Sequence, residues 1–180
     1  MQFISMWLLF TIATLSGFFY YAATADFITA FLHPLTMLLI IANAIILPRL
    51  QSLKPYYERF KSGIFTIFIT LLFIILVVHV AVIAFQSGYT FDLFIIVPLC
   101  VGTVLIITGN TLQRFRLPDN STVNRIWNQC IRPFSRILVI SGAVMILTIF
   151  SPGMMTIFFI ILGVMILALM ISFSKGVKTL

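Results

Sequence analysis

The stretch GIFTIFITLLFIILVVHVAVIAF, residues 63–85, is almost wholly apolar, and its one ionisable side chain is His79. It is long enough to form a helix that crosses the hydrocarbon core of a membrane, which requires about 20 apolar residues. About a quarter of the residues in a soluble domain are charged, whereas this chain of 180 residues has 8% charged and 62% hydrophobic residues. The composition excludes a water-soluble protein and predicts a multi-pass membrane protein.

Further apolar blocks lie on both sides of this stretch, and together they predict a single all-α integral membrane domain covering residues 1–180, a bundle of six transmembrane helices. The first block ends in Ala23-Thr24-Ala25, which has the small-x-small form of a signal-peptidase site. No Lys or Arg precedes that block, so a retained first helix is favoured over a cleaved signal peptide. The expected helices cover about residues 3–23, 27–47, 56–85, 92–109, 134–150 and 154–173.

The distribution of charge predicts the orientation of these helices. All 11 Lys and Arg residues fall in alternate polar intervals, and the opposite intervals contain only Asp26 and Asp92 as charged residues. Because positively charged intervals are retained in the cytoplasm, both termini are expected to be cytoplasmic. The net charge of +7 then reflects basic residues that set the orientation of the helices in the membrane, and no nucleic-acid partner is expected. The basic residues are Arg49, Lys54, Arg59, Lys61, Arg114, Arg116, Arg125, Arg132, Arg136, Lys175 and Lys178.

The longest polar interval is the basic segment, residues 111–136. Within it an apolar stripe at helical spacing predicts a cytoplasmic amphipathic helix over about residues 121–132, between the fourth and fifth transmembrane helices, with Asn120 or Ser121 as its N-cap. The fifth transmembrane helix is expected to begin near Pro133. The stripe consists of Val123, Ile126, Trp127, Cys130 and Ile131, and the opposite face of Asn124, Arg125, Asn128, Gln129 and Arg132.

Two interpretations of this amphipathic helix remain open. It could lie on the inner leaflet, with Trp127 anchored at the interface and the arginines facing the headgroups of membrane lipids. Alternatively, it could present a docking face for a cytoplasmic protein, or a plug for the bundle.

Two histidines form a second candidate site. His33 and His79 are each expected about 10 Å below the outer surface, counting 1.5 Å per residue from the helix ends. Intramembrane ionisable residues are functional candidates by default. A metal site, a proton site or a small-ligand pocket is one interpretation, and hydrogen bonding to neighbouring groups is the other. No paired metal-ligand spacing is present, so no metal is predicted.

The remaining polar features predict structural roles. Gly109 and Asn110 are expected to cap the end of the fourth helix. Cys100 and Cys130 are expected to be unpaired packing residues. The chain lacks a nucleophile elbow, a Walker loop and a dinucleotide fingerprint, so we expect no catalytic residues, no cofactor and no enzyme.

The order of residues in the basic segment resembles that of the SdpI-like family, membrane immunity proteins of bacteria that make secreted killing peptides. The resemblance covers about residues 47–147, and Cys130-Ile131 stands where the family has a Thr-His pair. The matching features are Gly109-Asn110, Arg116-Leu117-Pro118, Trp127 nine residues after the proline, Arg132 and Gly142.

The resemblance implies an immunity or tolerance protein of the bacterial cytoplasmic membrane. Such a protein would bind or block a toxic peptide at its outer or intramembrane face, and the resemblance also implies signalling through its cytoplasmic face. The alternative is a transport component, such as the substrate-binding subunit of a vitamin importer, although the short outer loops leave little for a lid over a pocket. The candidate partner or ligand residues are Gly109, Asn110, Arg116, Pro118, Trp127, Arg132, His79 and His33.

Overall fold

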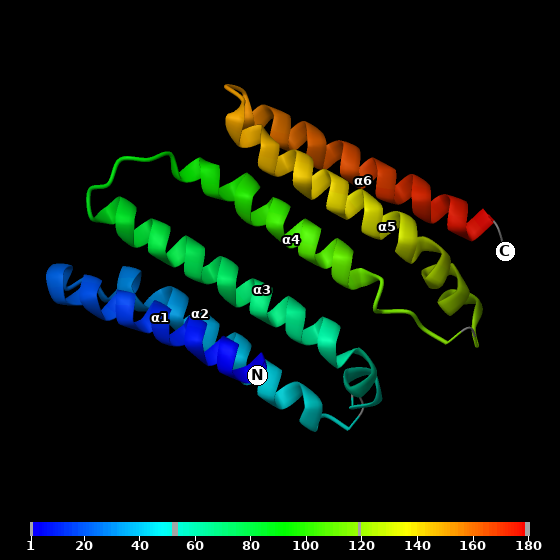
Figure 1. Ribbon diagram of the computed structural model, residues 1–180, viewed down its shortest axis with the longest axis horizontal. Coiled ribbons are helices and arrows are strands. Elements are labelled where there is room, and N and C mark those ends of the chain that lie inside the picture. The colour runs from blue at the N-terminus through cyan, green and yellow to red at the C-terminus, as the bar shows by residue number, and fades with distance from the viewer. Residues whose placement is uncertain (1, 52–53, 119, 179–180) are drawn as a thin grey trace. The chain divides into compact units, whose positions relative to one another are not determined.

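The computed structural model describes residues 2–51, 54–118 and 120–178, and its long elements are all helices (Figure 1). Three short 3-10 turns, η1 (Leu47–Arg49), η2 (Leu93–Ile95) and η3 (Thr148–Phe150), adjoin them. The all-α prediction is confirmed for the described residues. The helices are α1 (Gln2–Thr24), α2 (Phe27–Ile46), α3 (Lys54–Gln86), α4 (Ile96–Leu112), α5 (Thr122–Leu147) and α6 (Met154–Lys178).

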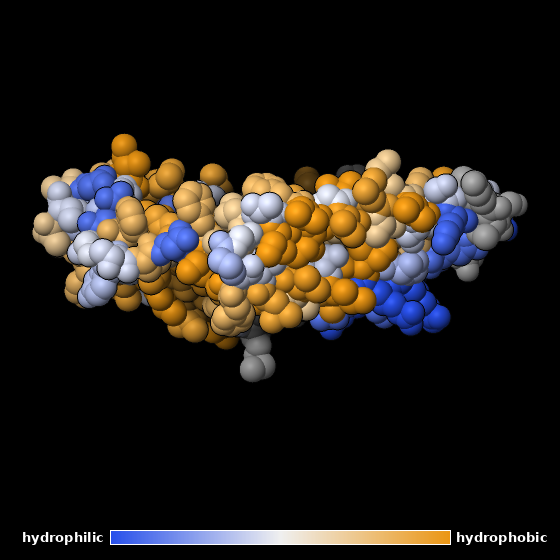
Figure 2. All heavy atoms as spheres, turned by 90° about the horizontal axis from the view of Figure 1, so that it is seen from above, coloured by the Kyte–Doolittle hydropathy of each residue, from blue (hydrophilic) through white to orange (hydrophobic). Residues whose placement is uncertain are grey.

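Six of the helical segments are long and apolar enough to cross a membrane. Large apolar side chains such as Phe19 (78% exposed) and Phe150 (85% exposed) point outward, and hydrophobic residues dominate the visible surface between the helix ends (Figure 2). An exposed apolar surface of this extent is stable in lipid but not in water. The chain is therefore a multi-pass membrane protein with six candidate spans, while its orientation stays a prediction.

The helices group into two compact units, residues 1–93 and residues 94–180. That the two units together form the single domain predicted for residues 1–180 stays a prediction.

In the first unit, α1, α2 and α3 all pack against one another. Ala25 has a left-handed backbone (φ 56°) in the short connection from α1 to α2. Asp26 caps α2, and its carboxylate accepts a hydrogen bond from the Thr29 amide at 3.2 Å. Hydrogen bonds from the side chain and the backbone of Thr29 hold the pKa of Asp26 below its ordinary value. The core of this unit is formed by Met6, Ala13, Met37, Ile41, Ala44, Tyr57, Phe65, Leu72 and Leu76.

The α1 and α2 backbones come very close at Gly17. A Cβ atom placed on Gly17 would overlap the carbonyl oxygen of Ala30. Pro34, which is buried inside α2, has no N–H to donate to the carbonyl four residues earlier, and that carbonyl belongs to Ala30. The glycine therefore gives the space in which the Ala30 carbonyl is accommodated.

In the second unit, α5 packs against both α4 and α6. A Cβ atom on Gly102 would lie 2.6 Å from the carbonyl oxygen of Gly142, and one on Gly142 would lie 2.6 Å from that of Gly102. Small residues of this kind allow helix backbones to approach closely in lipid. Cys100 and Cys130 are buried and unpaired, as predicted.

Two predicted boundaries in this unit were wrong. The structure has one continuous helix, α5, where we expected an amphipathic helix (121–132) followed by a separate helix (134–150), and Pro133 lies inside it. The fourth helix was expected to end at Gly109, but α4 continues to Leu112. A proline removes one helical hydrogen bond, whereas a break in the helix frees several backbone groups that lipid cannot satisfy.

Candidate functional site

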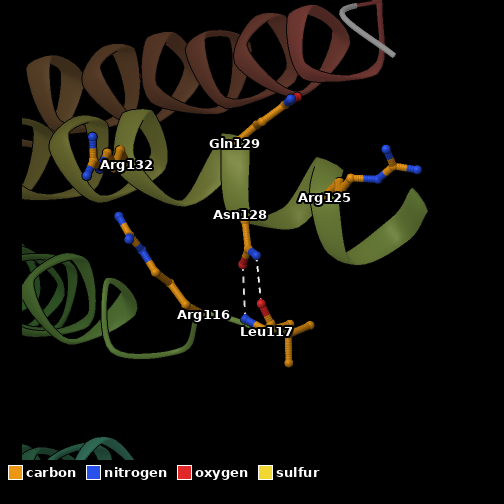
Figure 3. Close-up of a pocket in the computed structure, with 6 residues that line it drawn as sticks. All are labelled: Arg116, Leu117, Arg125, Asn128, Gln129 and Arg132. Atoms are coloured by element: carbon orange, nitrogen blue, oxygen red, sulfur yellow. Dashed lines mark hydrogen bonds between the residues drawn. The ribbon is translucent and has the colours of Figure 1, made fainter. Parts of the chain in front are cut away.

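The segment that joins α4 to α5 folds back along the first turns of α5. Trp127 donates a hydrogen bond from Nε1 to the Phe115 carbonyl at 2.8 Å. The amide of Asn128 binds the backbone of Leu117 twice, because Oδ1 accepts from the N–H at 3.0 Å and Nδ2 donates to the carbonyl at 2.7 Å (Figure 3). These contacts fix the backbone on both sides of Arg116.

The start of α5 holds the other end of the same segment. Of the two predicted N-caps, Asn120 and Ser121, the structure has Ser121, whose hydroxyl accepts a hydrogen bond from the Asn124 amide at 3.2 Å. The side chain of Asn124 donates to the carbonyl of Pro118 at 2.8 Å and to Oδ1 of Asn120 at 2.7 Å. The backbone carbonyl of Pro118 thus contributes to holding the segment on α5.

Three arginines line a pocket of about 670 Å³ that is formed between this segment and α5. In Figure 3, Arg116 reaches from the segment toward Arg132 on α5, while Arg125 lies nearer the start of the helix. All three side chains are exposed. The other lining residues are Leu117, Asn128 and Gln129.

The electrostatics of this pocket favour an anion. Asp26, Glu58 and Asp92 all belong to residues 1–93, and the one acidic residue of the second unit, Asp119, lies outside the described residues. Within the described residues the structure shows no ion pair for the three arginines. Guanidinium groups bind carboxylate and phosphate through paired N–H donors. The arginines that line this pocket are therefore suited to a carboxylate or phosphate.

The other predicted residues of this region have structural positions. Gly109 is buried in α4, and a Cβ atom on it would lie 2.8 Å from both the Ser135 carbonyl oxygen and Cγ2 of Val139. Asn110 is exposed on α4, within the last turn of the helix. The prediction that these two residues cap the fourth helix was therefore wrong, and neither lines the pocket. Gly109 instead brings α4 close to α5.

Sequence reasoning missed part of the pocket. Arg125, Asn128 and Gln129 were placed on the polar face of the predicted helix, but they were not identified as site residues. The sequence signal that could have identified these three residues is their helical spacing, which places them on the same face as Arg132. The fold-back of the segment at Leu117, which turns that polar face into one wall of a pocket, leaves no such signal in the sequence.

The two histidines lie together in the first unit. His33 on α2 and His79 on α3 have ring centroids 5.4 Å apart, with the ring planes inclined by 50°. His79 is fully buried, and its Nε2 lies 3.0 Å from the carbonyl oxygen of Ala13 on α1. Since a carbonyl oxygen can only accept a hydrogen bond, Nε2 carries the hydrogen, and in the neutral ring Nδ1 has a lone pair.

The histidine pair is only partly satisfied by hydrogen bonds. The Nδ1 atoms of both rings are buried and have no hydrogen-bond partner among the described residues. Leaving a buried polar atom unpartnered costs about 1–3 kcal/mol. Of the two interpretations of these histidines, hydrogen bonding to neighbours accounts for Nε2 of His79 but for neither Nδ1 atom. The described part of the chain holds no group of three or more His, Cys, Asp or Glu residues that could bind a metal ion.

Comparisons with known proteins returned no relatives: the sequence matches no family model, and neither the curated proteins nor the solved structures gave a match. A functional assignment therefore depends on the residues and their geometry.

Proposed function

We propose that this chain is a bacterial tolerance protein of the SdpI-like kind, which lies in the cytoplasmic membrane and reduces killing by a membrane-active peptide. One observation supports the proposal. Of the residues on which the resemblance is based, Arg116 and Arg132 line one pocket, and Trp127 fixes the backbone next to Arg116. Arg116 lies on the segment before α5 and the other two residues lie on α5, and the pattern that they share with the family corresponds to one site.

In the proposed mechanism the apolar helices and the basic pocket have different roles. The exposed apolar faces of the helices contact the peptide within the membrane, where an amphipathic peptide buries its own apolar face. The pocket binds an anionic group of a cytoplasmic protein, because three guanidinium groups are suited to acidic side chains. Through the binding of this cytoplasmic protein at the pocket, contact between the helices and the peptide would be signalled to the cytoplasm.

A killing assay tests this proposal. The gene is expressed in a bacterium that is sensitive to secreted killing peptides, and survival is measured across a panel of such peptides. We expect survival to rise with the native protein and to fall most of the way back with the double variant Arg116→Gln/Arg132→Gln. Immunoblotting of membranes checks that both proteins are present in equal amounts.

The matched control is Arg136→Gln. Arg136 is exposed on the same helix and carries the same charge, but it does not line the pocket. We expect this variant to protect as well as the native protein. Unchanged killing of cells that express the native protein, for every peptide in the panel, would refute the proposed function.

A further inference from the structure

We infer that His33 and His79 form a binding site for one soft monovalent metal ion, Cu(I), held between their two Nδ1 atoms. This inference is independent of the proposed function, because it concerns the first unit and a different group of side chains.

The protonation state of His79 is the first argument. Its Nε2–H is committed to the carbonyl of Ala13, so the lone pair on Nδ1 is directed into a buried region without a donor. His33 contributes a second buried and unpartnered Nδ1 atom. In one of its two neutral tautomers His33 also leaves Nδ1 without a hydrogen, and imidazole nitrogens in this state are metal ligands. One ion would satisfy both atoms at once.

The separation of the rings fits a shared ion. Metal–imidazole bonds are about 2 Å long, so two nitrogens that share an ion lie about 4 Å apart. Ring centroids 5.4 Å apart can bring their Nδ1 atoms to that distance by small rotations of the side chains. The first unit thus brings the two rings close enough for both to reach one ion.

The number and charge of the ligands select the ion. Zinc sites have three or four protein ligands, and the described residues provide no such group. A divalent ion with two neutral ligands would also leave two positive charges inside the hydrocarbon, where even one is costly. Cu(I) is stable with as few as two nitrogen ligands and adds a single charge. The buried thioether of Met37, one turn beyond His33 on α2, is a further soft group of the type that selects Cu(I).

The surroundings hold the pair in place. A Cβ atom on Gly17 would lie 3.7 Å from Nε2 of His79, so α1 packs directly against the ring. The nearest acidic residue along α2 is its N-cap, Asp26, whose carboxylate binds the amide of Thr29. The positive charge of the ion is therefore balanced by the ligand dipoles and not by a carboxylate on this helix.

Metal binding to the full-length protein tests the inference. The purified protein in lipid nanodiscs is titrated with Cu(I) under anaerobic, reducing conditions in competition with a chromogenic Cu(I) chelator. We expect one ion per chain, with X-ray absorption showing nitrogen neighbours at about 2 Å. His33→Leu and His79→Gln should each weaken binding by more than about 100-fold, since even changes in residues behind the ligands cost about 10- to 100-fold.

Three controls keep the outcome decisive. The amide of His79→Gln can still donate to Ala13, and circular dichroism shows whether this variant folds. If His79→Gln does not fold, the binding measurement on His33→Leu tests the inference instead. The side chain of His33 is only half-buried, so this substitution disturbs the core less. The double variant Cys100→Ser/Cys130→Ser should still bind one ion. The inference is overturned if the native protein binds no more Cu(I) than His33→Leu does. It is also overturned if the double cysteine variant no longer binds Cu(I), or if the two histidines take up a proton as the pH falls but bind no Cu(I).

Discussion

The carbonyl oxygen of Ala30 faces the bare Cα of Gly17, with no side chain between α2 and α1 at this point. This carbonyl belongs to the residue four positions before Pro34, so it has no helical N–H to accept from. The close approach of α1 and α2 at Gly17 therefore occurs where α2 has lost a hydrogen bond, directly beside the buried ring of His79.

We expect Gly17→Ala to destabilise the protein by about 1–3 kcal/mol, the usual cost of forcing extra volume into a packed interior. Thermal unfolding in detergent measures the change. The matched control is Gly163→Ala on α6, where a Cβ atom meets nothing within 4 Å. That variant should be neutral, or more stable by up to about 1 kcal/mol, because alanine is the better helix former. Equal effects of the two substitutions would contradict the close contact at Gly17.

The mutual contact of Gly102 and Gly142 predicts non-additive effects. Either residue changed to Ala would force α4 and α5 apart, because each Cβ atom would lie 2.6 Å from the carbonyl oxygen of the other residue. Once one substitution has separated the helices, the second meets less resistance. The loss of stability in the double variant should therefore be smaller than the sum of the single losses. Additive losses would show that the two glycines do not share one contact.

Replacing Asn128 should release the segment that bears Arg116. Asn128→Ala removes two hydrogen bonds from the backbone of Leu117, each worth about 1 kcal/mol. Hydrogen–deuterium exchange followed by mass spectrometry should show residues 113–118 exchanging about 10-fold faster or more, with α4 unchanged. Asn110→Ala, a change of the same type at an exposed position on α4, is the control and should leave the segment protected.

The N-cap of α2 should make stability depend on pH. Thr29 lowers the pKa of Asp26 in the folded protein, so the stabilisation is present above the pKa of an unfolded Asp and is lost as the pH falls through the lowered value. Asn caps helices about as well as Asp but does not titrate. Melting temperatures of the native protein and Asp26→Asn should therefore be similar near neutral pH, and that of the native protein should fall below that of the variant as the pH falls through this range. A difference that is constant with pH would rule out this role of Asp26.

The predicted orientation can be tested with single cysteines in a Cys100→Ser/Cys130→Ser background. Val123 and Tyr89 are 71% and 70% exposed and lie in a basic and a non-basic interval, respectively. By the positive-inside rule, a membrane-impermeant maleimide should label Tyr89→Cys in intact cells and Val123→Cys only after lysis. The reverse pattern would place both termini outside.

Much of the fold could be predicted because lipid imposes simple requirements on sequence. The apolar block from Gly63 to Phe85 falls within α3, since its length and composition permit only a spanning helix. Pro133 misled the prediction because the preference of proline for helix starts was given more weight than the cost of breaking a helix at a membrane.

The histidine pair was only partly predictable. The number of residues from each helix end predicted similar depths for His33 and His79. Their contact, however, depends on how α2 and α3 are rotated about their axes. That rotation is set by packing between distant positions, such as Gly17 against Ala30, which periodicity in a single segment does not encode.

The continuity of α5 has a consequence for the height of the basic pocket. The helical run from Thr122 to Phe150 has 29 residues, which at 1.5 Å per residue makes a rod about 43 Å long. The hydrocarbon core is about 30 Å thick, so the run is about 13 Å longer than an upright helix needs to cross it, and the polar first turns with Arg125 and Asn128 supply this excess. By the proposed function, we expect the pocket near the level of the lipid phosphates, where a partner would present its negative charge.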